Sequence, residues 1–225
     1  MRQTRPRSRA FPNAYIETDE PPNPAFRAKL LALVGLIGIT YLAFTILILH
    51  FQPTGYDPVR QAISDYGVGS FGNVMDIGFF AGGTGVAALG LALLSIKAEA
   101  RALNMGALLL VVVGFALFAV GVFPTDIEGT TPTTHGLIHD ALSLLLFGLG
   151  MIGTLLVSYA HGRRWPSFAL LGFTVAAASA AANEAFALDA SGLVERILVA
   201  VLLGWWIFIS FKTLKDPSEL DSGKT

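Results

Sequence analysis

Long apolar stretches separated by short polar segments form the main pattern of the chain. Each stretch is close to the ~20 residues with which a helix crosses a ~30 Å hydrocarbon layer. Helices are favoured over strands because every backbone amide in lipid must find a hydrogen bond within its own segment. The pattern predicts an all-α, polytopic membrane protein with six transmembrane helices in a single bundle, at about Leu30–His50, Val74–Ile96, Leu103–Phe123, His135–Ala160, Phe168–Leu188 and Leu193–Leu214.

Composition supports this prediction. Charged residues make up 14% of the chain and apolar residues 53%, whereas soluble domains carry about a quarter charged residues. The net charge of −1 provides no basic field for nucleic acid, so we expect no such partner. The absence of cysteine excludes disulfides, thiolate catalysis and cysteine metal sites.

The polar ends of the chain set its expected domain organisation. Residues 1–29 hold five prolines and are too polar to fold by burying apolar surface. The apolar run that follows is too long for a signal peptide, so we expect no cleavage. We therefore expect a disordered cytoplasmic tail over 1–29, the membrane domain over 30–214 and a second cytoplasmic tail over 215–225.

Basic residues predict the orientation in the membrane. With six spans, thirteen of the fifteen Lys and Arg residues fall on the side that holds both tails, and Arg60 and Arg196 fall on the other. We expect a multi-pass protein of the cell membrane with both termini in the cytoplasm.

Acidic residues and histidines gather on the opposite, outward side. Ionisable groups within a span are costly unless they are paired or hydrated, so they normally face the bundle interior. The sequence predicts an outward-facing polar pocket from the members of this set, which are His50, Asp57, Asp65, Asp76, Asp126, Glu128, His135, His139, Asp140, Glu184, Asp189, Glu195 and Arg196.

Two histidines lie four residues apart at the start of the fourth span, after Thr134 as the expected N-cap. This spacing places His135 and His139 on one helix face. They could ligate one metal ion, with Asp65 or Asp126 as a third ligand of an open zinc site. The alternative is a structural or proton-linked polar network without metal. No other cofactor is expected.

The sixth span begins beside two further charged groups. We expect an ion pair between Glu184 and Arg196 across the last hairpin, because burying either charge alone is far more costly. Asp140 points about 100° away from His139 and is expected to pair with Arg196 or to meet Glu184.

The first outward loop suggests further local structure. We expect a short interfacial helix over Val59–Tyr66, with Ser64 as a turn residue rather than a nucleophile. Asn73 is the expected N-cap of the second span. Gly78 and Gly82 form a small-xxx-small pair that predicts close helix packing.

Three segments of the chain resemble a known family. PTGYDPVRQAISDYG follows the first span, FPTD closes the third and HGLIHD opens the fourth. At these residues, and over residues 30–214, the chain is similar to the bacterial integral-membrane family called domain of unknown function 998. The resemblance implies six spans and no established activity.

A more distant resemblance is to the six-span damage-regulated autophagy modulators, a family that includes a lipid-remodelling protein. The segment from Ile63 to Gly67 and the pair His139–Asp140 match short motifs of that family. This resemblance implies lipid handling or membrane organisation, and it gives Asp65, His139 and Asp140 more weight than His135.

Three functional hypotheses follow. The first is a membrane protein whose outward pocket binds or organises membrane lipid. The second is an intramembrane lipid-modifying hydrolase or transferase that uses His139 with Asp65, Asp126 or Asp140. The third is a small transporter, for which spans three, four and six lack acids in their inner halves.

Overall fold

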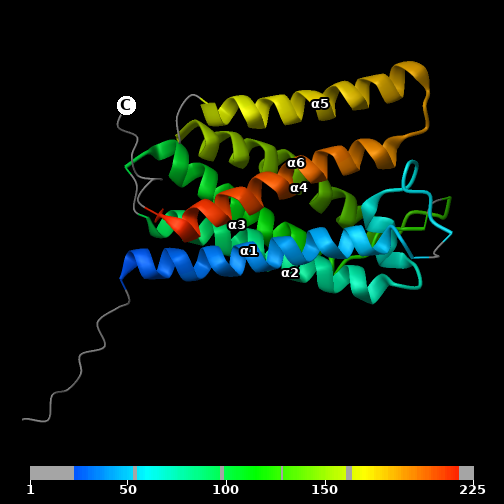
Figure 1. Ribbon diagram of the computed structural model, residues 1–225. Coiled ribbons are helices and arrows are strands. Elements are labelled where there is room, and N and C mark those ends of the chain that lie inside the picture. Colours follow the sequence, from blue (N-terminus) through cyan, green and yellow to red (C-terminus); the bar gives the residue numbers. More distant parts are fainter. Residues whose placement is uncertain (1–22, 53–54, 97–98, 128, 161–163, 218–225) are drawn as a thin grey trace, which may run out of the picture.

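The computed structural model of the protein describes residues 23–52, 55–96, 99–127, 129–160 and 164–217. Within these ranges the regular structure consists of six long α-helices and one short 3₁₀ helix, without a strand (Figure 1). The prediction of an all-α protein with six helices able to cross a membrane is confirmed. The elements are α1 Pro24–Leu49, η1 Ile63–Val68, α2 Gly72–Ser95, α3 Arg101–Val120, α4 Thr134–Ala160, α5 Arg164–Phe186 and α6 Ser191–Lys215.

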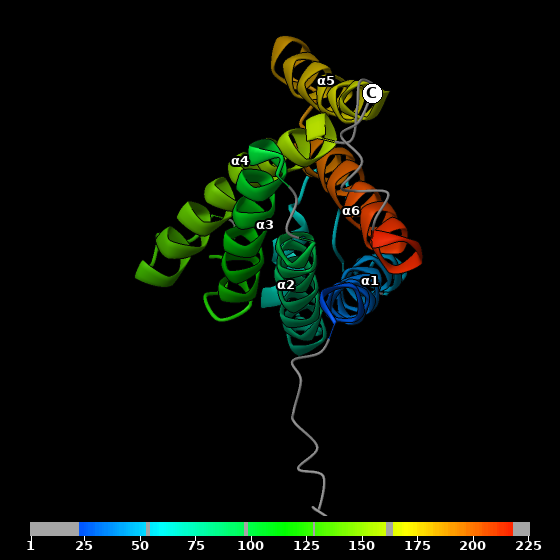
Figure 2. The same cartoon turned by 90° about the vertical axis from the view of Figure 1, so that its left-hand side faces the viewer.

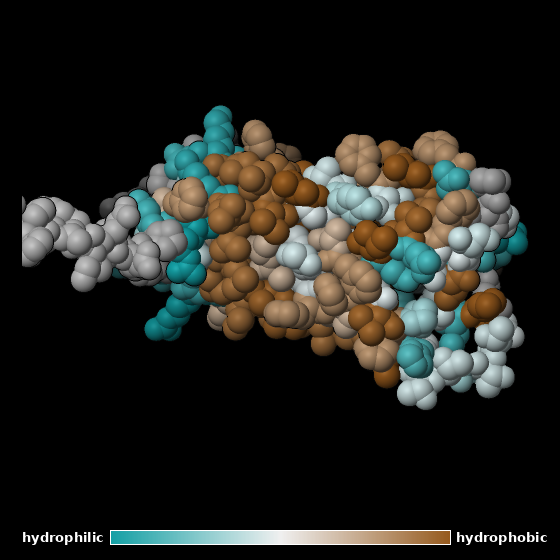
Figure 3. Space-filling view, turned by 90° about the horizontal axis from the view of Figure 1, so that it is seen from below, coloured by the Kyte–Doolittle hydropathy of each residue, from teal (hydrophilic) through white to brown (hydrophobic). Residues whose placement is uncertain are grey.

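The dimensions of the helices suit a bilayer. They contain 20 to 27 residues each, which corresponds to about 30–40 Å at 1.5 Å per residue. A broad hydrophobic band covers the middle of the molecule, with hydrophilic residues toward both ends (Figure 3). The chain is therefore built as a multi-pass membrane protein.

The first helix begins earlier than predicted. The Asn23 side chain accepts a hydrogen bond from the Ala25 amide at 2.9 Å, and Pro24 occupies the first helical position. Both are strong helix-start signals. The expected disordered tail is consequently wrong for residues 24–29, whereas residues 1–22 lie outside the described ranges.

The helices follow a simple order in the bundle. Helices α1 to α4 pack one against the next, and α6 returns to pack against α1. Helix α5 lies at the periphery, where it packs against α6 and α4 (Figure 2). Helix α2 lies between α1 and α3 and is the most buried span.

The two ends of the bundle differ. The start of α1, the end of α2 and the residues after α6 lie together, where Asn23, Ser95 and Pro217 line a common hollow. The opposite end, here called the η1 end, carries η1 and the connections α1–α2, α3–α4 and α5–α6 (Figure 1). The described candidate functional residues lie toward the η1 end, whereas Glu128 lies outside the described ranges.

Glycines allow close approach of the inner helices, as predicted. An added Cβ at Gly78 would lie 2.9 Å from the Thr45 side chain, and one at Gly82 would lie 2.5 Å from Leu42. Both neighbours belong to α1, so the small-xxx-small pair on α2 forms the α1–α2 contact.

Three local predictions for the η1 end need correction. The helix expected over Val59–Tyr66 is a 3₁₀ helix over Ile63–Val68. The carbonyls of residues 59 and 60 accept hydrogen bonds from α6 instead of closing helical turns. Helix α2 begins at Gly72, so Asn73 lies inside it and is not the cap. Thr133, not Thr134, caps α4, since its hydroxyl oxygen accepts a hydrogen bond from the Gly136 amide at 3.2 Å.

Candidate functional site at the η1 end

The start of α6 fixes the loop that leads to η1. The first amides of a helix have no partner within it. In α6, the Gly192 amide donates to the Arg60 carbonyl at 3.1 Å, and the Leu193 amide donates to the Val59 carbonyl at 2.9 Å. A Cβ at Gly192 would overlap the Gln61 carbonyl, so only glycine permits this approach.

Arg196 continues the same attachment one turn further along α6. Its Nη1 donates to the carbonyls of Gln61 at 2.7 Å and Gly192 at 2.9 Å, and its Nε donates to His50 Nε2 at 2.8 Å. His50 Nδ1 in turn lies 2.6 Å from the Ile46 carbonyl. A carbonyl only accepts, so these bonds assign His50 as the neutral Nδ1–H tautomer, with Nε2 as acceptor.

The ion pair expected between Glu184 and Arg196 is not formed. Glu184 is exposed at the end of α5, and the donors of Arg196 are directed to the loop and to His50. Asp140 is exposed on α4 and makes no ion pair with Arg196 among the described residues. The peripheral position of α5 explains the difference, because it carries Glu184 away from the first turns of α6.

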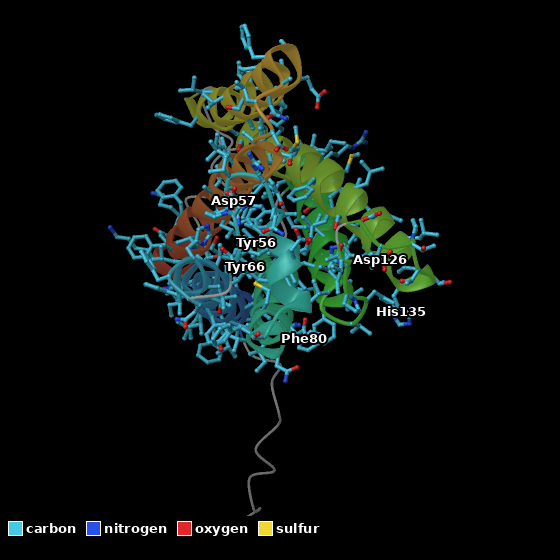
Figure 4. The ribbon with its side chains drawn as sticks, turned by 90° about the vertical axis from the view of Figure 1, so that its right-hand side faces the viewer. Tyr56, Asp57, Tyr66, Phe80, Asp126 and His135 are labelled. Carbon is cyan, nitrogen blue, oxygen red and sulfur yellow. The ribbon has the colours of Figure 1, made fainter. Side chains whose placement is uncertain are left out.

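Two tyrosines of the first loop surround the Arg196 guanidinium. The Tyr56 and Tyr66 ring centroids lie 4.2 Å apart (Figure 4), and Arg196 Cζ lies 6.0 and 5.9 Å from them. Burial raises the pKa of the Tyr56 hydroxyl, the Asp65 carboxylate raises it further, and Arg196 acts in the opposite direction. The hydroxyl therefore stays protonated at physiological pH and is a hydrogen-bond donor.

Two carboxylates hold the beginning of η1. The Ala62 amide donates to Asp65 Oδ2 at 3.1 Å, and the Ile63 amide donates to Glu195 Oε2 at 2.9 Å. Asp65, a predicted site residue, thus has a structural bond of its own. Glu195 belongs to the outward polar set predicted from the sequence, but its bond to η1 was not predicted.

Asp126 and the two histidines of α4 form a second group, of which Figure 4 labels Asp126 and His135. Thr133 donates to Asp126 from its amide at 2.8 Å and from its hydroxyl at 2.7 Å. These bonds, and secondarily the nearby imidazoles of His135 and His139, lower the pKa of the Asp126 carboxyl. Asp126 therefore interacts electrostatically with both histidines.

The two histidines nevertheless have different surroundings. His135 is exposed, with its ring centroid 5.6 Å from that of Phe123. His139 is 3% exposed, and its Nδ1 donates to the Phe123 carbonyl at 2.8 Å. This bond leaves Nε2 of the neutral ring as an acceptor. Within the described ranges, no three His, Asp or Glu residues are placed to hold a metal ion.

His139 lines a small cavity inside the η1 end of the bundle. The cavity has a volume of about 60 Å³ and is mostly apolar, with Ser64, Ser143 and Glu195 as its other polar side chains. No hydrogen bond between described residues joins the His139 ring to either serine, so a nucleophile and base are not paired here. The cavity can hold a few water molecules on this polar side.

A larger groove lies on the outer surface between α1 and α6. Its volume is about 590 Å³, within the ~300–1,000 Å³ typical of small-molecule sites. Small residues leave this space open, namely Ala43 on α1 and Ala200 and Gly204 on α6. The groove is apolar along most of its length and reaches His50 and Arg196 at the η1 end.

The groove and the cavity share a wall. Four aliphatic side chains line both spaces, and they come from α1, η1 and α6. These residues are Ile46, Ile63, Val199 and Leu203.

Sequence reasoning therefore identified some site residues and missed others. Arg196, Asp65, Asp126 and the two histidines lie at the η1 end as expected, whereas Asp140 and Glu184 are exposed and separate. The residues missed as site members are Tyr56, Ser64, Tyr66 and Ser143. Most of them occur in or beside the segment between the first two spans, where two tyrosines near an arginine and an acid were the available signal.

Comparison with known proteins identifies a family but no function. A sequence family described as "Protein of unknown function (DUF998)" matches residues 36–212. No curated protein and no solved structure matches the chain.

Proposed function

The chain belongs to the DUF998 family of proteins of unknown function, and we propose that it binds a membrane lipid in the groove between α1 and α6. The observation that supports this proposal most directly is the distribution of apolar and polar residues along the groove. It is apolar where it would meet hydrocarbon and ends at the hydrogen-bonding groups of Arg196 and His50. That polarity matches a lipid lying along the helices with its headgroup at the η1 end.

Selectivity for one lipid over another would arise at the polar end of the groove. An acyl chain that moves from the bilayer into the groove exchanges one apolar environment for another, so its transfer contributes little free energy. Hydrogen bonds to the headgroup are made in a partly buried site, where they are stronger than in water. Recognition therefore depends on the residues around Arg196.

The orientation of the protein in the membrane is part of this proposal. The bias of basic residues toward the terminal end supports an orientation with both termini in the cytoplasm and the η1 end on the other side of the cell membrane. The bound lipid would then come from the outer leaflet.

Filling the groove tests the proposal. An added Cβ at Gly204 meets no atom within 4 Å, so Gly204→Phe can place a ring in the groove without disturbing the helix contacts. We expect native mass spectrometry of the purified variant to show several-fold less bound lipid than the wild type, with an unchanged melting temperature.

Gly148→Phe is the matched control. Gly148 is an exposed position on α4, remote from the groove lining, where an added Cβ likewise meets nothing within 4 Å. Lipid retention should match the wild type. Equal retention by both variants, or an equal loss in both, would show that the groove is not the lipid site.

A further inference from the structure

The Arg196 guanidinium has N–H donors that make no hydrogen bond within the described part of the protein. An arginine side chain carries five N–H groups. Those on Nε and Nη1 are used for His50, Gln61 and Gly192, whereas Nη2 is buried without a hydrogen-bond partner. Buried donors of this kind normally have a hydrogen-bond acceptor. The unpaired Nη2 therefore indicates an acceptor that is not part of the described protein, such as a bound ligand.

Tyr56 provides a second donor of the same kind. Its hydroxyl is also buried and has no hydrogen-bond partner. Its oxygen is close enough to the Arg196 guanidinium for this contact to lower the pKa of the hydroxyl, but the contact lacks the geometry of a hydrogen bond. Two unpartnered donors around one guanidinium suit an oxygen anion, which accepts several hydrogen bonds at once.

The neighbouring charges restrict what kind of anion fits. Asp65 acts electrostatically on the Tyr56 hydroxyl, and Glu195 adjoins Arg196 on α6. The single positive charge of Arg196 is thus balanced by the Asp65 carboxylate, and a ligand with net negative charge gains little net attraction here. A ligand that carries a positive group next to its anion is attracted by both charges.

On the basis of the lipid site proposed above, we infer that the lipid is a zwitterionic phospholipid. Its phosphate accepts hydrogen bonds from Arg196 Nη2 and Tyr56 Oη, and its ammonium group lies toward Asp65. A hollow beside this position is lined by Tyr56, Gln61 and Asp65 and has a volume of about 410 Å³. It provides room for the end of the headgroup.

Lipid titrations of the full-length protein in detergent micelles, followed by native mass spectrometry, test the inference. The probes are phosphatidylethanolamine, phosphatidylglycerol, which lacks the ammonium group, and diacylglycerol, which lacks the phosphate. We expect the wild type to bind phosphatidylethanolamine most tightly and diacylglycerol least tightly. Equal affinity for all three would overturn the inference while leaving the lipid groove intact, since Gly204→Phe would still reduce binding of each.

Tyr56→Phe removes the unpartnered hydroxyl and keeps the ring. We expect about tenfold weaker binding of phosphatidylethanolamine, the equivalent of one hydrogen bond to a charged acceptor, and unchanged binding of diacylglycerol. The melting temperature without lipid should not fall, because the lost hydroxyl had no protein partner. Tyr66→Phe, in the same ring stack, should retain the wild-type affinity.

Two results would contradict this role for Tyr56. One is equal affinity of Tyr56→Phe and wild type for phosphatidylethanolamine, which would indicate a bridging water instead. The other is displacement of the lipid by inorganic phosphate, which would identify a free anion as the ligand.

Discussion

Arg196 connects three parts of the η1 end through single hydrogen bonds. Its side chain reaches His50 at the end of α1, Gln61 in the loop before η1 and Gly192 in its own helix. None of these partners is an acid. The residue therefore acts as a donor to backbone and imidazole acceptors, and the order of the first loop depends on it.

Arg196→Ala should lower the stability of the protein by about 3 kcal/mol, because it leaves two carbonyls and the His50 ring without their charged donor. Thermal unfolding in detergent, followed by circular dichroism, measures the change.

Arg60→Ala is the control for the loss of an arginine at the same end. Arg60 pairs with Asp57 at 3.6 Å and Asp189 at 3.2 Å, but its side chain is 62% exposed. Exposed ion pairs contribute little, so we expect a change below about 1 kcal/mol. Comparable destabilisation by both substitutions would refute the role assigned to Arg196.

The position of Arg196 was predictable from sequence, but its partners were not. An ionisable residue in an apolar span predicts a partner within the bundle. Helical periodicity does not say which neighbouring segment provides it. Glu184, across the last hairpin, was the predicted partner, whereas the true partners are neutral backbone groups and His50, which lies 146 residues away in sequence.

At the scale of the elements, the contact between α2 and α3 is set by glycine. A Cβ at Gly114 would overlap the Ala87 amide nitrogen and lie 2.6 Å from the Gly83 carbonyl. Backbone meets backbone here, and no flexible side chain can move aside.

Gly114→Ala should therefore push α2 and α3 apart and cost about 1–3 kcal/mol, as overpacking does in well-packed interiors. Resistance to unfolding by sodium dodecyl sulfate measures the effect. Gly148→Ala, at an open position, should be neutral or slightly stabilising, because alanine favours a helix. A Gly114→Ala protein as resistant as the wild type would show that the two helices have room to adjust.

The helices themselves were largely predictable, whereas the connections between them were not. Bilayer thickness limits the length of an apolar span, so hydrophobic runs located all six helices. The loop before η1 depends instead on hydrogen bonds from the start of α6, more than 120 residues later in the chain. No local pattern in residues 59–62 reveals those partners. The predicted cap of α4 was wrong by one residue, because Thr133 and Thr134 are chemically equivalent as caps.

At the scale of the whole molecule, six crossings bring the start of α1 and the end of α6 to one face of the membrane (Figure 1). Which face this is depends on the distribution of basic residues. The absence of cysteine from the chain makes the orientation directly measurable.

Single cysteines at exposed positions on the two sides should react differently with a membrane-impermeant maleimide. We expect Thr131→Cys, at the η1 end, to be labelled on intact cells, and Glu99→Cys, in the α2–α3 connection, to be labelled only after permeabilisation. The reverse pattern would place the η1 end in the cytoplasm.

Four aliphatic side chains line both the groove and the cavity and form their common wall. Such side chains change rotamer within nanoseconds where they are not tightly packed. Rotation of Ile46 or Leu203 about its own bonds would change the separation between the two spaces while the helices stay in place. Communication between the hydrocarbon of the bilayer and the imidazole of His139 would then be controlled by the torsion angles of a few carbon–carbon bonds.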